Sequence, residues 1–351
     1  MSISKFNESF VYIGNNDGSN NSTQIFEAFK NSCNNIIEIN LLDYYKPYQT
    51  WNILDKILYR VKFLFFLKLS IISKLKNLNP KLIVINQFFF FSLLDLLLIK
   101  LVMKDTKLIF LTLDSMNQLR RFELFFKIRL KLYDIVCHTK TQDINYYACI
   151  EKKTIFFNQG FKSHNFNEFL HEQNYSKKDI DIIFIGNFMP RRFSFLNELM
   201  LDPRFTKKRI LVGGRGWNGK FKQLSNNHKI IDYTSGDEYY ELFNRSKVAL
   251  IFFNEVAKDF TTTRVNELLS LNVAILSEIN PVTNELFAES QLFSDFLEFK
   301  EKTYKLLELS FLQYLELIKA QKKISAQIGN KTWDEEIKFL YSRLNEKDIS
   351  N

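Results

Sequence analysis

The amino-acid sequence predicts an α/β protein made of two Rossmann-like, doubly wound domains. In both halves of the chain, short apolar strands alternate with segments of helical period, a pattern typical of a parallel sheet covered by helices on both faces. The 351 residues are enough for two domains of ordinary size, each with its own core. With 46% hydrophobic and 25% charged residues, the composition is that of a globular chain rather than a disordered or fibrous one.

The first half begins with a strand, a polar loop and a helix. The apolar run Phe10 to Gly14 ends at a glycine, and a helical pattern follows through Ile25, Phe26 and Phe29. Further strands are expected at Ile36 to Ile39, Leu82 to Ile85, Leu108 to Leu113, Ile135 to His138 and Ile155 to Phe157. We therefore assign residues 1–165 to a first domain and residues 166–178, which lack periodicity, to a linker.

The second half restarts the same pattern, and residues 179–330 are assigned to a second domain. Its strands are expected at Asp181 to Ile185, Arg209 to Val212, Lys229 to Ile231, Val248 to Phe253 and Val273 to Ser277. Its helices are expected from about Phe193, at Asp237 to Asn244 behind a Ser235/Glu238 capping box, from about Thr262 to Leu271, and at Glu301 to Ile328. A C-terminal helix at Trp333 to Leu344, within residues 331–351, is expected to pack back across.

The formal net charge of +9 is unevenly distributed. Residues 1–170 carry 22 Lys/Arg against 14 Asp/Glu, a balance of +8, so the remaining residues carry +1. A basic half of this kind attracts an anionic membrane, a polyanionic glycan or a nucleic acid; a solvated, Lys-rich surface is the alternative. Because no compact recognition motif accompanies the charge, a nucleic-acid partner is not expected.

Two segments bear on membrane contact. Phe88 to Val102 is the most apolar run, but it contains Asp95 and Lys100 and is too short to span a bilayer, so we expect a buried helix. Leu54 to Lys76 mixes apolar and basic residues, as a helix lying on anionic lipid does. A packed helix with its lysines in water is the alternative for this segment.

The termini and cysteines indicate the compartment. Met1 to Ser9 lacks the basic start and apolar run of a signal peptide, so no export is expected. Cys33, Cys137 and Cys149 are odd in number and show no Cys-x-x-Cys spacing, which disfavours a disulfide framework or a zinc site. A reducing cytoplasm fits these features best, with peripheral contact at the inner face of the membrane as a further expectation.

Loops after the predicted strands of the second domain are the candidate ligand-binding segments, because doubly wound sheets bind ligands beyond the carboxyl ends of their strands. Gly186 lets the backbone approach a ligand, and Arg191 and Arg192 can grip a phosphate; a surface arginine pair at a helix start is the alternative. The glycine-rich stretch containing Gly214 and Arg215 matches neither a P-loop nor a GxGxxG fingerprint.

The most informative segment is the helix that carries Arg264 and Glu267. These residues are three apart and share one face, and Thr261 to Thr263 can cap the helix start. The positive end of the helix dipole would then face an anion such as a pyrophosphate, with Arg264 one turn away. Glu267 has acceptors enough for a ribose diol. An ordinary helical ion pair is the alternative.

This order of strand, acidic loop, Arg-x-x-Glu helix, strand and turn resembles the donor site of GT-B glycosyltransferases of the group 1 type, especially their CgeB-like, spore-maturation branch. The resemblance spans roughly Tyr133 to Leu344 and is strongest in YYELFNRSKVALIFFNE and DFTTTRVNELLSLNVAILSEINPVTNELF. It implies a GT-B fold, with two Rossmann-like domains facing a cleft. It also implies transfer of a sugar from a nucleotide-diphosphate donor to a glycan, lipid-linked or protein acceptor in cell-surface polysaccharide synthesis.

The resemblance also implies roles for particular residues. Glu267 would bind the ribose, and Asp259, eight positions earlier, would face the transferred sugar as a catalytic residue. Arg264 would hold the diphosphate together with Arg191 or Arg192, and the choice between these two stays open. The implied donor-binding set is Gly186, Arg191, Arg192, Gly214, Arg215, Thr263, Arg264 and Glu267.

The acceptor side is less defined, because the first half lacks the Gly-Gly-x-x-x-His pattern common in other group 1 enzymes. Asp114 directly follows a predicted strand and is the candidate acid/base, with a capping or loop role as the alternative. Gly14 and His138 are further acceptor-side candidates at strand ends, although a lone His is more often structural. GT-B enzymes usually stabilise the leaving diphosphate with protein charges, and without an Asp-x-Asp motif no essential metal is expected. A sugar-nucleotide epimerase or a non-catalytic glycan- or membrane-binding protein of the same fold are the alternatives.

Overall fold

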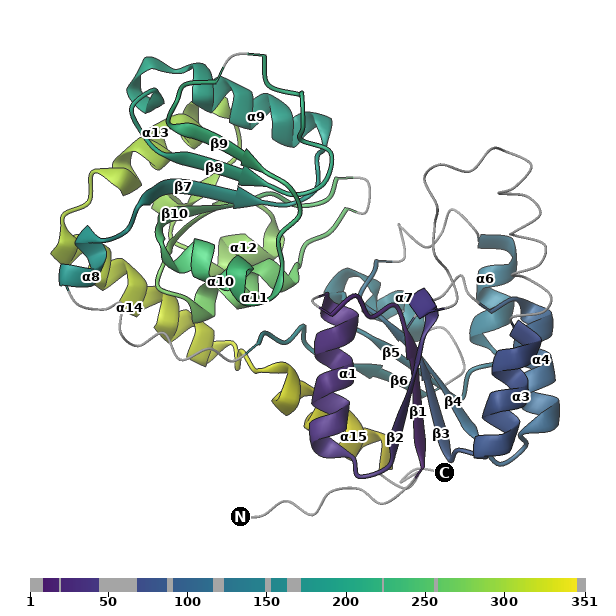
Figure 1. Ribbon diagram of the computed structural model, residues 1–351. Coiled ribbons are helices and arrows are strands. Elements are labelled where there is room, and N and C mark those ends of the chain that lie inside the picture. The colour runs from purple at the N-terminus through teal and green to yellow at the C-terminus, as the bar shows by residue number, and fades with distance from the viewer. Residues whose placement is uncertain are drawn as a thin grey trace. The chain divides into compact units, whose positions relative to one another are not determined.

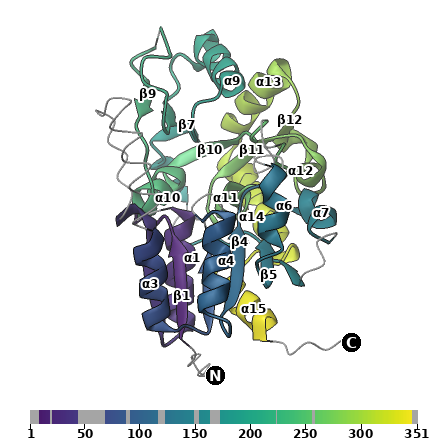
Figure 2. The ribbon, with the colours of Figure 1, turned by 90° about the vertical axis from the view of Figure 1, so that its right-hand side faces the viewer.

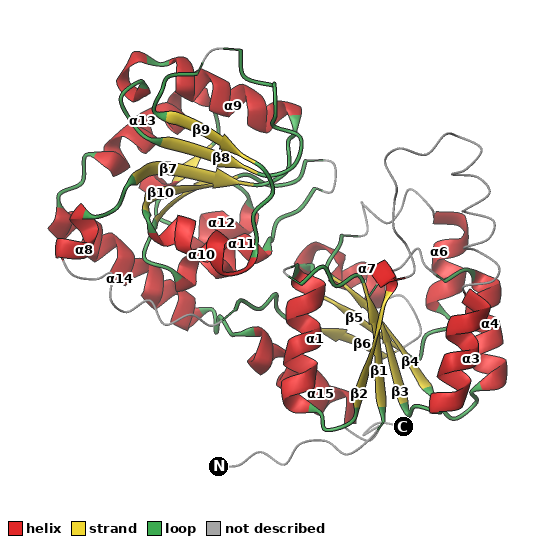
Figure 3. Ribbon diagram, in the orientation of Figure 1, coloured by secondary structure: helices red, strands yellow, loops and turns green. Residues whose placement is uncertain are grey.

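The computed structural model describes residues 9–18, 20–43, 68–86, 91–115, 123–148, 153–162, 172–222, 224–255 and 258–345. The chain divides into two compact units (Figures 1 and 3). The first is Met1–Gln159 with Val256–Lys258 and Trp333–Asn351, and the second is Gly160–Glu255 with Asp259–Thr332. The last helix therefore returns to the first unit. Among the described helices, none is both long and apolar enough to cross a membrane.

The first unit is built on a six-stranded parallel sheet in the order β2-β1-β3-β4-β5-β6. The strand order reverses between β1 and β3, which is the topological switch point of this sheet. The inner strands are apolar and buried on both faces, as expected for a parallel sheet between two helix layers, whereas the edge strands β2 and β6 are partly exposed. The strands are β1 (Phe10–Gly14), β2 (Ile36–Asn40), β3 (Leu82–Ile85), β4 (Lys107–Thr112), β5 (Ile135–His138) and β6 (Lys153–Phe156).

Helices cover both faces of the first sheet (Figure 1). One face carries α1 (Asn21–Ser32) and α15 (Trp333–Asn345), and the other carries α3 (Lys68–Leu78), α4 (Leu93–Val102), α6 (Glu123–Leu130) and α7 (Ile144–Ala148). Local sequence sets their starts: the Asn20 side chain accepts the Thr23 N–H at 2.9 Å, and Ser92 forms a capping box with Asp95.

The second unit is built on a parallel sheet in the order β12-β11-β10-β7-β8-β9. Numbered from its own first strand this is 3-2-1-4-5-6, the order of dinucleotide-binding folds, with the switch point between β7 and β10. The strands are β7 (Ile180–Ile185), β8 (Ile210–Gly213), β9 (His228–Ile231), β10 (Ser246–Ile251), β11 (Ala274–Glu278) and β12 (Leu292–Phe293).

Helices also sandwich this second sheet (Figure 3). One face is covered by α10 (Gly236–Asn244), α11 (Thr263–Ser270) and α12 (Pro281–Leu286), and the other by α9 (Pro190–Leu201) and α13 (Phe296–Leu307). The long helix α14 (Phe311–Gln327) packs Tyr314 and Ile318 against β11. The short helix α8 (Glu172–Ser176) precedes β7, within the stretch for which the sequence predicts only a linker.

The start predicted for α10 is correct to within one residue, but its capping box and the single helix predicted over 301–328 are wrong. Ser235 is the N-cap of α10, but its side chain makes no capping bond; Glu238 instead accepts a hydrogen bond from the Thr234 hydroxyl at 3.0 Å. The single helix predicted over 301–328 is two helices, α13 and α14. Ser310 ends the continuity, because its side chain caps the first turn of α14 in a capping box with Gln313.

The helix predicted to be buried at Phe88 to Val102 is α4, and the prediction holds for one face only. Leu96 is fully buried against the sheet, whereas Leu94 and Leu101 are 75% and 68% exposed. The basic segment predicted at Leu54 to Lys76 is described only from Lys68, where α3 begins, and residues 54–67 lie outside the described part.

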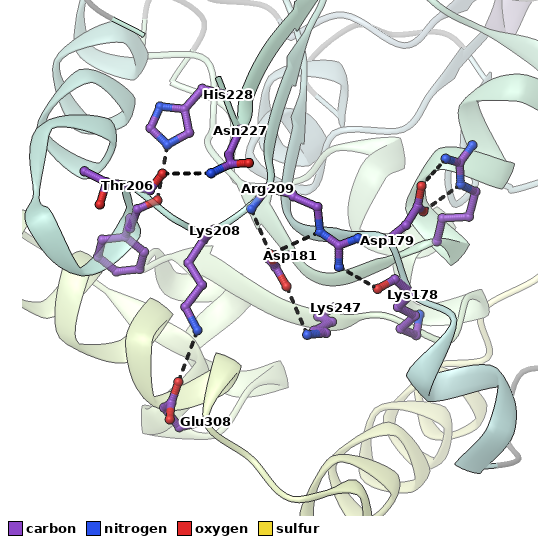
Figure 4. Close-up of polar contacts among 12 residues, drawn as sticks. Lys178, Asp179, Asp181, Thr206, Lys208, Arg209, Asn227, His228, Lys247 and Glu308 are labelled. Atoms are coloured by element: carbon purple, nitrogen blue, oxygen red, sulfur yellow. Dashed lines mark hydrogen bonds and ion pairs between the residues drawn. The ribbon is translucent and has the colours of Figure 1, made fainter. Parts of the chain in front are cut away.

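Charged residues close the amino-terminal edge of the second sheet (Figure 4). Asp181 accepts the Arg209 backbone N–H at 2.8 Å and pairs with Lys247 at 3.0 Å. Asp179 forms a two-pronged pair with Arg245. The Lys178 ammonium donates to three backbone carbonyls, those of Asn244, Ser246 and Asn272, at 2.6 to 2.8 Å. This network ties the starts of β7, β8 and β10 together.

Candidate functional site

The opposite edge of the second sheet gathers the residues that the sequence singled out. Gly186 directly follows β7, Gly214 follows β8, and α11 starts after the loop that leaves β10. Strands β7 and β10 are neighbours from which the chain turns in opposite directions, so the loops after them open a crevice in this fold class. The sequence therefore places its candidate ligand loops at the switch point.

Arg264 lies on α11 and reaches over the end of β7. A Cβ at Gly186 would sit 3.1 Å from the Arg264 Nη1 and 2.8 Å from the Phe184 ring, so the absence of a side chain gives the guanidinium its place. The Arg264 Nε donates to the Tyr239 hydroxyl at 3.1 Å, and the guanidinium lies 5.8 Å from the centroid of that ring. Burial lowers the pKa of Arg264, but Tyr239 and Glu267 outweigh it and raise the pKa overall.

Glu267 is buried beneath Arg264 and held by two tyrosines of α10. Its Oε2 accepts the Tyr239 hydroxyl at 2.7 Å, and its Oε1 accepts the Tyr240 hydroxyl in a longer bond of 3.5 Å. Burial raises the pKa of Glu267, and Arg264 and both tyrosines oppose that rise. The helical ion pair considered from the sequence is thus a relay, in which Arg264 donates to Tyr239 and Tyr239 donates to Glu267.

Arg192 and Arg191, adjacent on α9, have different surroundings. Arg192 is only 9% exposed and donates to the carbonyls of Asn187 and Phe252, which follow β7 and β10. Burial and the charge of Arg264 lower the pKa of Arg192 to about 10. Arg191 instead pairs with Glu278 and, at 3.0 Å, with Glu255. The two carboxylates neutralise Arg191, whereas carbonyl groups hold the charge of Arg192.

The positive charge of Arg192 and Arg264 is not cancelled at close range. In the described part of the chain their direct partners are two carbonyls and a phenol, and no carboxylate lies within ion-pair distance of either guanidinium. Carboxylates act on both arginines at longer range: Glu255 and then Asp259 raise the pKa of Arg192, and Glu267 raises that of Arg264. Two such arginines side by side form a site that an anion of two charges would stabilise.

The glycine-rich loop after β8 packs against the loop after β7. Gly214 has a φ of +126°, and a Cβ there would lie 2.3 Å from the Gly186 carbonyl oxygen. Trp217 locks the contact by donating its Nε1 hydrogen to that oxygen at 2.6 Å. Arg215 is exposed and stacks its guanidinium over the Tyr233 ring at 4.7 Å. Glycine at 214 is therefore required for the close approach of the two loops.

Thr263 begins α11, and the cap predicted within Thr261 to Thr263 is correct in position but not in its side-chain bond. The N-cap residue is Thr262, whose side chain makes no capping hydrogen bond. Its carbonyl accepts the Val265 N–H at 3.0 Å, so the backbone alone starts the helix. Asp259 precedes this turn and donates its N–H to the Asn254 carbonyl at 3.2 Å.

The acceptor-side candidates lie at strand ends of the first sheet. Gly14 ends β1 where a Cβ would lie 2.5 Å from the Ser22 Oγ, so packing alone demands glycine there. His138 ends β5, is 2% exposed and stacks on Tyr147 with ring centroids 4.4 Å apart. Burial lowers the pKa of His138 to about 4, which keeps the imidazole neutral. Asp114 follows β4 and is exposed.

Sequence reasoning missed Tyr239 and Tyr240. They were interpreted only as part of a helix, because aromatic residues at helical spacing usually fill a core. The residue type itself could have indicated their role. A buried tyrosine carries a hydroxyl that needs a hydrogen-bond partner, whereas phenylalanine, which occurs 36 times in this chain, does not. Glu278 was missed as well; it fixes Arg191 and accepts the Phe253 N–H at 3.1 Å.

Comparison with known proteins agrees with this architecture. Residues 191–332 match a protein family described as glycosyl transferase-like. The whole chain is similar to a UDP-forming α,α-trehalose-phosphate synthase from Burkholderia xenovorans, with 10% identity over 98% of this chain and 100% of that one and a TM-score of 0.64. The chain has the GT-B fold.

Two further structures with this fold have nucleotides bound. A trehalose-6-phosphate protein from E. coli bound with UDP-2-fluoro glucose is 12% identical over 97% of this chain and 99% of that one, with a TM-score of 0.62. HepE from Anabaena, in complex with UDP and glucose, is 9% identical over 97% and 100%, with a TM-score of 0.63. No curated protein matches the sequence. At these identities the similarity establishes the fold, and the glycosyl transferase-like match covers most of the second unit.

Proposed function

We propose that this protein is a glycosyltransferase that moves a sugar, of hexosyl type, from a nucleotide-diphosphate donor to a glycan, lipid-linked or protein acceptor. The observation that carries the proposal is the pair Arg192 and Arg264 at the switch point of the second sheet, with no close carboxylate in the described residues to cancel their charge. A diphosphate supplies the missing negative charge. The bound UDP and UDP-sugar of similar structures support the same ligand class.

In this proposal each group near the switch point has one task. Arg192 and Arg264 stabilise the departing diphosphate, and Gly186 lets it approach the backbone. Thr263 presents the start of α11 to the same anion. Glu267, whose carboxylate form is favoured by Arg264 and the two tyrosines against the effect of burial, accepts from the ribose hydroxyls.

The remaining assignments belong to the same proposal. Asp259 faces the transferred sugar, and Gly214 and Arg215 border the nucleotide from the β8 side. Arg191 acts indirectly, because its pairs with Glu278 and Glu255 fix the start of α9. Asp114 acts as the acid/base toward the acceptor, with Gly14 and His138 beside it at the strand ends of the first unit.

We further propose that the reaction needs no metal ion, that it serves cell-surface polysaccharide synthesis, and that the enzyme works in the cytoplasm on the inner face of the membrane. The two arginines provide the charge that a metal would otherwise bring to the diphosphate. The CgeB-like branch of the group 1 enzymes is the proposed subfamily. Donor turnover that a chelator abolishes and magnesium or manganese restores would refute the metal-independent mechanism.

The decisive experiment is calorimetric titration with a panel of nucleoside diphosphates, using wild type and Glu267→Gln. One nucleotide should bind, and Glu267→Gln should weaken it by about tenfold or more, because a charged acceptor is lost. Glu241→Gln is the matched control, since this glutamate of α10 pairs with Arg245 away from the site and should leave binding unchanged. Wild-type affinity in Glu267→Gln would exclude the donor-site assignment.

A turnover assay with sugar nucleotides, with and without acceptor, distinguishes two alternative functions of the same fold. Net conversion of a donor sugar without acceptor would identify an epimerase, since that reaction uses the same donor pocket. Nucleotide binding without turnover of any sugar nucleotide, with or without acceptor extracts, would identify a non-catalytic binding protein.

A further inference from the structure

Helix α4 of the first unit presents leucine to solvent on the face opposite the one it buries. Leu96 and Ile99 point to the sheet and are fully buried. Leu94, Leu97 and Leu101 recur at helical spacing and are 75%, 45% and 68% exposed. The outer face of a helix that covers a sheet is normally polar, so the exposed stripe formed by these three leucines indicates a contact with another apolar surface.

The leucine stripe is held firmly in place, because both flanks of α4 are tied to neighbouring elements. On one flank Asp95 accepts the buried Lys68 ammonium of α3 at 2.7 Å. On the other flank Lys100 donates to Asp134, just before β5, at 2.5 Å. With its buried stripe and both flanks occupied, α4 cannot rotate to hide the leucines.

The neighbouring helices extend this surface. Helices α3 and α6 pack against α4 on the same face of the sheet (Figure 2). Among the side chains whose burial the structure describes, each adds one exposed aliphatic residue, Leu69 at 47% and Ile128 at 48%. We call the outer surface of α3, α4 and α6 the leucine face; its exposed apolar residues are Leu69, Leu94, Leu97, Leu101, Val102 and Ile128.

The charge of the leucine face is basic. Within residues 68–78, 93–105 and 126–131, the exposed basic side chains are Lys74, Lys76, Lys104, Lys127 and Lys131. In the same ranges Asp105 is the exposed acidic residue. Leucines surrounded by lysines are the composition of surfaces that lie on anionic lipid, where apolar side chains enter the acyl boundary and lysines meet headgroup charge.

We propose that the leucine face docks on an anionic lipid bilayer, with α4 lying in the interface. Protein interfaces are enriched in aromatic residues and arginine and depleted in lysine, whereas the described leucine face exposes aliphatic residues and lysine. In the described residues the contact surface shares only Leu69, Lys74 and Lys76 with the segment Leu54 to Lys76 considered from the sequence, and Lys68 of that segment is buried in its pair with Asp95. This docking is independent of nucleotide binding and of the proposed sugar transfer.

The test is flotation of the full-length protein with lipid vesicles. Binding is expected to vesicles of phosphatidylcholine with about 30 mol% phosphatidylglycerol, to weaken as salt is raised, and to be absent on phosphatidylcholine alone. Leu94→Glu/Leu101→Glu should reduce the bound fraction by at least about tenfold, since two leucines no longer enter the lipid. The matched control is Leu297→Glu/Leu312→Glu, whose leucines in the second unit are 72% and 71% exposed and should not affect binding.

Three results would overturn the docking: no binding of wild type to anionic vesicles, equal loss in the control variant, or retained binding in Leu94→Glu/Leu101→Glu. A wild-type dimer that this variant dissociates, without any lipid binding, would show that a second copy covers the face instead. The variant Lys104→Glu/Lys131→Glu tests the contribution of charge separately, because it leaves the leucines intact. It should weaken vesicle binding and make that binding less sensitive to salt. Unchanged melting temperatures and nucleotide affinity certify that the variants are folded.

Discussion

The two edges of the second sheet hold similar charged residues in different ways. At the amino-terminal edge each arginine has a carboxylate: Arg245 pairs with Asp179, and Arg209 contacts Asp181. At the carboxyl edge, in the described residues, Arg192 and Arg264 are held by carbonyls and a phenol. Carboxylates neutralise Arg209 and Arg245 at the first edge, as they do Arg191 at the second, whereas the neutral partners of Arg192 and Arg264 only orient their charge.

The pKa shifts express the same difference. At the amino-terminal edge burial raises the pKa of Asp181, but the Arg209 N–H and Lys247 outweigh burial and lower it. At the carboxyl edge burial dominates for Glu267, whose pKa stays raised. At the amino-terminal edge the Asp181 carboxylate is already stabilised by its protein partners, so a ligand there would add little stabilisation. At the carboxyl edge the Glu267 carboxylate, whose pKa stays raised, would gain from a further hydrogen-bond donor such as a ribose hydroxyl.

The largest expected effect is on nucleotide affinity, and it is tested by replacing one arginine at each edge of the second sheet. Arg264→Met should raise the dissociation constant of the nucleoside diphosphate by about 100-fold, because a desolvated charge that contacts the ligand is removed. Arg209→Met should change it by less than about twofold, because that arginine is half exposed and serves only its own edge. Calorimetry on both variants measures the ratio. Equal losses would mean that the carboxyl edge has no special role in binding.

A substitution at the amino-terminal edge, Lys178→Met, is expected to change stability instead of nucleotide binding. Lys178→Met removes the donor of three carbonyls, of which that of Asn272 also accepts the Tyr314 hydroxyl at 3.0 Å. We expect the free energy of unfolding to fall by about 3 kcal/mol, because buried acceptors are left unsatisfied. Nucleotide affinity of the folded variant should not change. The measurement is urea denaturation followed by circular dichroism.

Lys208→Met is the control for this stability change. Its ammonium pairs with Glu308 at 3.3 Å on the surface, so the loss should stay below about 0.5 kcal/mol. A similar loss in both variants would show that the three carbonyl bonds of Lys178 contribute no more than a surface ion pair.

The fold was predictable because its strands are short apolar runs separated by polar loops. Strands such as β1 and β3 were located to the residue, and the others differ by one or two residues at their ends, except the two-residue β12, which was not predicted. The break at Ser310 was missed because the apolar period continues through it, and the Ser310 cap acts only once Gln313 has reached back. The outer face of α4 was missed because hydrophobicity indicates burial but not which face is buried.

The site was predictable where a residue acts through its position on one element. Gly186, Arg264 and Glu267 could be placed at a strand end and on one helix face, and they do lie there. The contacts between elements could not be predicted. Tyr239 reaches Arg264 and Glu267 from a helix that lies some 25 residues earlier in the chain, and the partners that distinguish Arg191 from Arg192 come from β10 and β11.

The smallest expected effect concerns the relay that orients the carboxyl-edge charges. Tyr239→Phe keeps the buried ring but removes the bond to Glu267 and the acceptor of Arg264, so nucleotide affinity should fall by about tenfold. The neighbouring Tyr240→Phe removes only a 3.5 Å bond and should change affinity by less than about twofold.

The pH dependence of binding shows whether Tyr239 acts through the charge of Glu267 or only through packing. In the proposed site the ribose hydroxyls donate to the ionised Glu267 carboxylate, so affinity should decrease as pH falls through the raised pKa of Glu267. The Tyr239 hydroxyl lowers that pKa, so in Tyr239→Phe the pKa rises further and the acid limb moves to higher pH. Tyr240→Phe should move it less. If nucleotide affinity falls at the same acidic pH in wild type and Tyr239→Phe, although the variant binds more weakly, Tyr239 acts only by packing. Arg264 would then be oriented by the backbone of α11 alone.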